Sequence, residues 1–316
     1  MRFFYLTAAV FAAAASAAPY KNNLIAVRQA APITDAVILN YALTLEHLED
    51  KFYREALANF TESDFTDAGF DASVYANIKE VSADETTHVA FLTGALKKAG
   101  ATPVQECTYS FGVTDVKSFL ATASILEGVG VSAYLGAAAD IMSKNYLTAA
   151  GSILTVESRH SAYIRASLKE SPFPSPFDAP LDFNEVYTLA APFIVSCPSD
   201  NPTLPVKAFP ALAASPDNPA NVTTGTKITL LTPGYTLTAA DGKSQVYAAF
   251  ITVTGPVFTP ATAVEGGYSF VVPEAPEGTA PISGQSYIVL TGCNTTVSDD
   301  TVAAGPGVVE ITNLLA

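Results

Sequence analysis

The sequence has little charge and few basic residues. Charged side chains make up 15% of its 316 residues, whereas 49% are hydrophobic; typical soluble domains have about a quarter charged residues. So apolar a composition argues against a disordered chain. The 16 Lys and Arg stand against 30 Asp and Glu, which gives a net charge of −14. This balance argues against binding to nucleic acid or to an anionic membrane surface, because both require clustered basic residues.

Cysteine is equally scarce. Three Cys allow one disulfide, in any of three pairings, and leave one thiol over. Cys107 and Cys197 lie in loop-like contexts in the same half of the chain, whereas Cys293 lies in a distant segment of different composition. We therefore favour a Cys107–Cys197 disulfide, which suits an oxidising compartment.

The N-terminus carries a candidate export signal. Residues 1–18 combine one basic residue, an apolar run of about a dozen residues and Ala15-Ser16-Ala17, which fits the cleavage pattern of signal peptides. A retained membrane anchor is the less favoured alternative, because the run is short for a bilayer core of about 30 Å. Glycosylation sequons at Asn59, Asn221 and Asn294 agree with export. We therefore expect a secreted glycoprotein, outside the cell or in the cell wall, with no membrane contact after signal removal.

Length and composition predict more than one domain, since a single core usually stops growing near this size. Apolar residues recur at helical spacing up to about residue 200 and form short alternating or β-branched runs beyond about residue 220. We expect an α+β multidomain fold with a four-helix bundle at 33–170, a Pro-rich strapping segment and linker at 171–220, and a small β-sandwich-like domain at 221–316.

The hydrophobic periodicity also places the elements. Helices are predicted over 34–58, 71–99, 115–144 and 146–170. Strands are predicted over 226–232, 246–254, 267–272, 286–291 and 307–312.

Only three histidines are present, and two of them interrupt apolar helical stripes. In the second helix Glu85 and His88 occupy the middle of such a stripe, and Glu157 and His160 repeat the arrangement in the fourth. Glu127 lies in the stripe of the third helix. Buried acidic groups are costly unless they are paired or bound to a metal. Several of them at one level therefore indicate a cation.

The first helix offers two more carboxylates. Glu46 and Glu49 lie beside its apolar stripe, so either could turn inward, whereas His47 is expected to be a solvated helix residue. Hairpins near residues 65 and 144 would bring the acidic groups of the four helices to a similar depth. Two alternatives follow: a metal site, or a buried network in which Glu and His hydrogen-bond each other without metal.

The order Glu, Glu-x-x-His, Glu, Glu-x-x-His is the ligand set of ferritin-like di-iron and di-manganese carboxylate proteins. Hard carboxylates with two imidazoles suit iron or manganese, and zinc less well. We therefore expect two Fe or two Mn ions as the cofactor.

Five runs within about residues 33–212 carry a family resemblance: 39–53, 83–88, 127–136, 157–160 and 172–177. In these runs the sequence resembles the ferritin-like domain of fungal stress-response proteins of the Rds1 type, which are related to plant desiccation proteins.

The resemblance selects the ligands residue by residue. It implies Glu46 as the ligand from the first helix, because Tyr53 follows seven residues later. The implied metal ligands are Glu46, Glu85, His88, Glu127, Glu157 and His160. Tyr53 and Asp84 are expected to support these ligands from outside. Asp84 matches the acidic residue that the family pattern has directly before the first Glu-x-x-His pair. Val156 departs from this pattern before the second pair, which predicts weaker hydrogen-bond support for His160.

Two functions are consistent with the sequence. The first is a secreted di-metal protein that reacts with dioxygen or peroxide in stress response, as an oxidase, a ferroxidase or a catalase-like enzyme. The second is a non-catalytic stress or developmental protein whose metal site is structural or vestigial. The β-domain contains no His and is expected to be a packing or interaction module. The sequence leaves the oligomeric state open, a homo-oligomer included.

Overall fold

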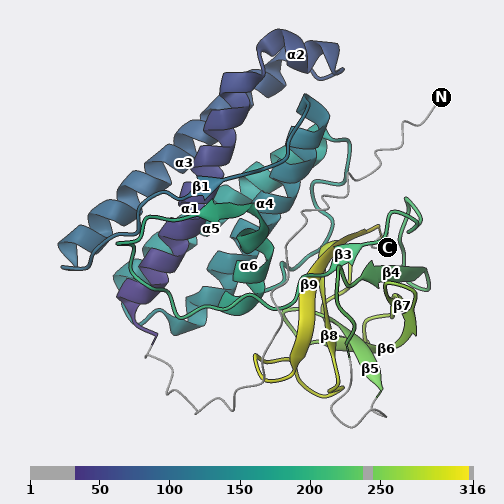
Figure 1. The fold of residues 1–316 in the computed structure, drawn as a ribbon. Coiled ribbons are helices and arrows are strands. Elements are labelled where there is room, and N and C mark those ends of the chain that lie inside the picture. The colour runs from purple at the N-terminus through teal and green to yellow at the C-terminus, as the bar shows by residue number, and fades with distance from the viewer. Residues whose placement is uncertain (1–32, 238–244, 313–316) are drawn as a thin grey trace.

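The computed structural model describes residues 33–237 and 245–312. A helical part is followed along the chain by a β-domain, and the two pack side by side (Figure 1). The predicted signal peptide at 1–18 lies outside the described residues.

Four long helices form the bundle. They are α1 (Asp35–Asn59), α3 (Ala72–Lys98), α4 (Val116–Ala137) and α5 (Lys144–Ser167). Helix α1 pairs with α3, and α4 pairs with α5. A window of α4 is apolar enough to cross a membrane, but 67% of it is buried inside the fold, as befits the core helix of a bundle. The predicted bundle is therefore confirmed.

One predicted helix boundary is wrong. Helix α4 ends at Ala137 and passes into the 3₁₀ turn η1 (Ala138–Asp140), whereas we expected it to reach about Lys144. The Asp35 carboxylate accepts hydrogen bonds from the backbone N–H groups of Met142 and Ser143. These bonds to the start of α1 fix a turn where the helix would otherwise continue, and Lys144 begins α5 instead.

Two short helices were not predicted. Helix α2 (Glu62–Asp67) joins α1 to α3 and begins with a capping box. Helix α6 (Phe183–Ala190) and the turn η2 (Ala191–Phe193) lie in the Pro-rich segment, and α6 packs against α4. Both helices are too short for a clear hydrophobic period.

The segment after α6 is fastened to the bundle. Strand β2 (Ile194–Ser196) pairs with β1 (Thr108–Tyr109), which precedes α4. Beside this pair the predicted Cys107–Cys197 disulfide is confirmed. The part of the 171–220 segment that holds α6 and β2 is thus a strap along the helices, whereas Ala213–Ala214 near its end joins the sheet of the β-domain.

The β-domain contains one antiparallel sheet within the described residues. Its strands are β3 (Ala213–Ala214), β4 (Lys227–Leu231), β5 (Val246–Phe250), β6 (Val257–Val264), β7 (Gly267–Val271), β8 (Gly284–Thr291) and β9 (Val302–Ile311). They lie in the order β3-β4-β7-β6-β5-β8-β9.

This sheet curls on itself. Strands β4 and β9 are far apart in the strand order, yet the Leu230 side chain lies against Gly307. The expected small β-domain is therefore present, but as one near-barrel sheet where we expected two stacked sheets. The sequence did not reveal β6, because Pro260 lies inside it opposite Tyr247.

The β-domain docks on α4 and α5 through specific polar contacts. The Tyr287 hydroxyl on β8 donates to the Gly128 carbonyl at 2.7 Å and accepts from Ser132 Oγ at 3.0 Å. Arg165 on α5 makes a bidentate ion pair with Glu310 on β9, with N–O distances of 3.0 and 2.6 Å. The bundle and the β-domain are therefore joined by specific bonds as well as by apolar contact.

We predict that Tyr287→Phe lowers the free energy of unfolding by about 1–3 kcal/mol, because the buried groups on α4 lose their partner. Tyr247→Phe is the matched control, since among the described residues no hydrogen bond involves its hydroxyl; its effect should stay within about 0.5 kcal/mol. Denaturant unfolding measures both variants, and equal stabilities would contradict the docking role of Tyr287.

Candidate metal centre

The six ligands implied by the sequence lie together in the middle of the bundle, on α1, α3, α4 and α5. The four glutamates have no exposed surface, and the two histidines are 8% and 6% exposed. These residues are Glu46, Glu85, His88, Glu127, Glu157 and His160. Glu46 lies beside the apolar stripe of its helix and the other five lie within such stripes, so all six side chains turn toward the interior of the bundle.

Their ligand atoms form two overlapping groups. Glu46 and His88 belong to one group, Glu127 and His160 belong to the other, and Glu85 and Glu157 belong to both. Within each group the four ligand atoms lie within 4.8 Å of one another. The two groups share two carboxylates, each adds one further glutamate and one histidine, and each could hold a metal ion.

The imidazoles face the shared carboxylates through Nδ1. His88 Nδ1 lies 3.1 Å from Glu46 Oε2, 3.2 Å from Glu85 Oε2 and 3.4 Å from Glu157 Oε1. His160 Nδ1 lies 3.1 Å from Glu85 Oε1. Ionised carboxylate oxygens only accept hydrogen bonds, and Nδ1 of a neutral histidine is also an acceptor when its ring proton is on Nε2. In that tautomer the site presents converging lone pairs.

The donor set fits a metal pair. Five buried atoms at the centre have no hydrogen-bond partner among the described residues: Glu85 Oε1, Glu127 Oε2, both oxygens of Glu157 and His160 Nδ1. Buried polar atoms are nearly always satisfied, and each exception calls for an explanation such as an ion. A cluster of such atoms favours the metal site over the alternative of a self-satisfied Glu–His network.

Hydrogen bonds from outside hold the ligands in place. The Tyr53 hydroxyl donates to Glu127, and the Tyr134 hydroxyl donates to Glu46. The Tyr163 hydroxyl takes no part in this support and accepts a hydrogen bond from Asn77 Nδ2. Burial raises the pKa of Tyr53 and Tyr134 well above 10, and the adjacent carboxylates add to the shift. Both hydroxyls therefore act as donors at neutral pH.

The outer support of the two histidines differs from the sequence expectation. Asp84 on α3 lies 3.2 Å from Nε2 of His160 on α5, so it supports the histidine of the opposite pair. No described residue accepts a hydrogen bond from Nε2 of His88. His160 therefore has an outer partner, which corrects our expectation. Val156 precedes the second Glu-x-x-His pair as Asp84 precedes the first, and its apolar side chain offers no acceptor to either histidine.

His47 takes no part in the centre. It is half-buried, and its Nε2 lies 3.2 Å from the Val104 carbonyl oxygen. Burial lowers its pKa. The expectation of a solvated helix residue is therefore wrong, because the segment that leads to β1 covers this side of α1.

Burial and charge shift the pKa values strongly. Burial alone lowers the pKa of His88, but the adjacent carboxylates, Glu157 first, outweigh it and raise the pKa to about 12. Contacts with Glu127 and other carboxylates likewise outweigh burial and raise the pKa of His160 to about 11. Burial raises the pKa of Glu46 to about 8. Without metal the centre therefore holds protons at neutral pH.

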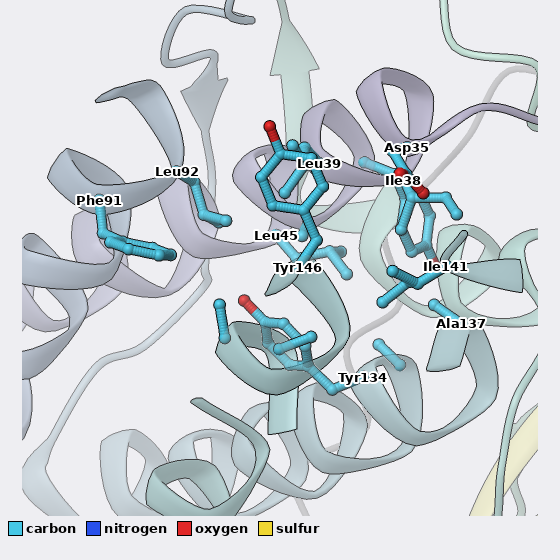
Figure 2. A pocket seen from close by; sticks show the side chains of 15 residues that line it. Asp35, Ile38, Leu39, Leu45, Phe91, Leu92, Tyr134, Ala137, Ile141 and Tyr146 are labelled. Carbon is cyan, nitrogen blue, oxygen red and sulfur yellow. The ribbon is translucent and has the colours of Figure 1, made fainter. Parts of the chain in front are cut away.

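An apolar pocket adjoins the centre at the end of the bundle where α1 begins. Tyr134 lies among the side chains that line it, together with Ile38, Leu39, Leu92 and Tyr146 (Figure 2). Because the Tyr134 hydroxyl is bonded to Glu46, this side chain separates the pocket from the ligands.

The fold and the ligand set define a ferritin-like protein. Residues 34–170 match the family model of the ferritin-like domain. The chain is also similar to protein rds1 of Schizosaccharomyces pombe, with 27% identity over 258 residues, which is 81% of this chain and 60% of that protein. The helical part is therefore a ferritin-like domain, and the chain is similar to proteins of the Rds1 type.

We predict that the metal-free protein loses stability as the pH rises from about 5 to about 8. Folded Glu46 keeps its proton up to about pH 8, and folded His88 and His160 keep theirs well above the ordinary pKa of 6.5. The unfolded chain releases these protons earlier, so the folded state binds more protons and its stability falls with pH. Glu85 titrates below this window, since the two histidines outweigh burial and lower its pKa to about 2.

Bound metal should abolish this decline, because the ligands have then released their protons. Thermal unfolding between pH 5 and pH 8, with and without Mn²⁺, checks the prediction. A metal-free Tm that rises with pH in this range would contradict it.

We also predict that Asp84→Asn weakens metal binding about tenfold, since an outer partner of a ligating histidine tunes its basicity. Val156→Asp should strengthen binding, because it gives His88 the kind of partner that Asp84 gives His160. Anaerobic calorimetric titration measures both variants. Unchanged metal affinity in both variants would refute the idea that a carboxylate next to one Glu-x-x-His pair supports the histidine of the other pair.

Proposed function

We propose that this protein binds two iron or two manganese ions and reacts with dioxygen or peroxide. The observation that carries the proposal is the pair of overlapping ligand groups with Glu85 and Glu157 in both. The ferritin-like domain, in which carboxylate-bridged metal pairs occur, supports it. When bound, such a metal pair would supply redox chemistry toward these oxidants.

The protein's own residues would set the conditions for that chemistry. Four buried glutamates carry the charge that offsets two divalent cations. Tyr53 and Tyr134 hold two of the glutamates in fixed orientations, and Asp84 does the same for His160. The surrounding apolar side chains exclude bulk water, which strengthens the electrostatic attraction between carboxylates and metal.

The alternative is a structural or vestigial metal site in a non-catalytic stress or developmental protein. The complete burial of all four glutamates favours it, because a site without exposed ligands restricts access for a substrate. Both functions include the metal site, but only the first includes turnover of dioxygen or peroxide.

We further propose that the protein is secreted, glycosylated and active in stress response. The Cys107–Cys197 disulfide suits an oxidising compartment. Asn59, Asn221 and Asn294 are all exposed and therefore accessible to glycosylation. The stress role rests on the Rds1-type resemblance, and the chain spans about 60% of the length of that relative.

Turnover separates the two functions. We predict that protein loaded with Fe²⁺ consumes dioxygen, or that protein loaded with Mn²⁺ decomposes peroxide, and that Glu157→Gln reduces the rate by at least about a hundredfold because it removes a shared ligand. Glu80→Gln is the control, since Glu80 is exposed on α3. Tight binding of two metal ions without either reaction would favour the structural role.

A further inference from the structure

A fifth carboxylate lies beside the six ligands. Glu49 follows Glu46 by one turn of α1 and is only 5% exposed. No described residue gives it a hydrogen bond or an ion pair. An ionised carboxylate buried without a partner is costly. A cation at the centre would remove that cost.

Glu49 faces α4 at Gly130, where the shared ligand Glu157 also lies. A Cβ atom added to Gly130 would lie 3.0 Å from Glu157 Oε2 and 3.1 Å from Glu49 Oε1. Both carboxylates therefore face the same point on the α4 backbone. Glycine inside a helix costs about 1 kcal/mol relative to alanine, and room for two carboxylates explains its use at Gly130.

The charge environment agrees with this placement. Burial raises the pKa of Glu49 well above its ordinary value, and the charges of the four ligand glutamates, Glu157 first, raise it further. Glu49 therefore belongs to the same buried charge cluster as the ligands.

An apolar cavity adjoins Glu49. Its volume is about 190 Å³, and it lies between α1, α4, α6 and the turn η2. Leu48, Val129, Ala190 and Phe193 are among its walls, and Glu49 is the only charged group that lines it. A cavity with mostly apolar walls admits small apolar molecules. Dioxygen fits this description, whereas a hydrated ion does not.

We propose that Glu49 is a fifth carboxylate ligand of the metal pair and that dioxygen reaches the metals through the cavity beside it. This inference rests on the proposed function, since it requires a metal pair at the centre. A fifth negative charge favours metal ions of higher positive charge, so Glu49 suits a centre that becomes oxidised.

Anaerobic titration with Co²⁺ tests the ligand role without any turnover. Glu49→Gln keeps the shape of the side chain and removes its charge. We expect it to bind Co²⁺ at least about tenfold more weakly at one of the two positions and to change the visible absorption of the bound Co²⁺. The exposed Glu80→Gln should match the unchanged protein in both measurements.

Stability provides a second readout. Without metal, Glu49→Gln should be at least as stable as the unchanged protein, because it removes an unpartnered buried acid. It should gain less stability from added Co²⁺, because binding is weaker. If the unchanged protein binds two Co²⁺ ions and Glu49→Gln has the same affinities and spectrum, the ligand role is refuted. If the unchanged protein binds none, the proposed function itself fails.

Filling the cavity tests the route. We expect Ala190→Phe to keep two Co²⁺ ions and to slow dioxygen consumption by the Fe²⁺-loaded protein several-fold, because its ring occupies the cavity. Xenon, which enters dry apolar cavities, should slow the unchanged protein in the same way. An unchanged rate under both treatments would overturn the route.

Discussion

The burial of several carboxylates at one level of a helical bundle is the constraint on which this structure depends. Glu46, Glu85, Glu127 and Glu157 have no contact with solvent. Lone ionised carboxylates in such a place would each cost several kcal/mol. Two histidines and two tyrosine hydroxyls reduce this cost, yet five buried atoms keep no hydrogen-bond partner within the described residues. The remaining charge is what a pair of metal ions would balance.

The rest of the fold can be understood as support for that arrangement. Helices α1 and α3 pair on one side, and α4 and α5 pair on the other, so that each pair contributes one Glu-x-x-His. The strap carries α6 onto α4, and the Cys107–Cys197 disulfide fastens the strap just after β2. The β-domain contacts α4 and α5 from outside, through Tyr287 and Arg165. None of the ligands comes from it.

Much of the bundle and its ligand set could be predicted from the sequence, because Glu and His at helical spacing inside apolar stripes are conspicuous. Contacts between elements could not be predicted. Asp84 on α3 supports His160 on α5. This contact joins two helices, so the spacing of residues along one helix cannot reveal it. Glu49 was set aside in favour of Glu46, since only the packing against Gly130 shows that both turn inward. Strand β6 was missed because its Pro260 is unusual in a strand.

The number of metal ions bound per chain tests the central claim most directly. The measurement is elemental analysis of the protein after anaerobic reconstitution with Fe²⁺ or Mn²⁺ and removal of free metal, with Glu85→Gln beside the unchanged chain. The account predicts two ions per unchanged chain and a loss of both in the variant, because Glu85 belongs to both ligand groups. A stoichiometry near zero in the unchanged chain would contradict it and leave a buried Glu–His network without metal.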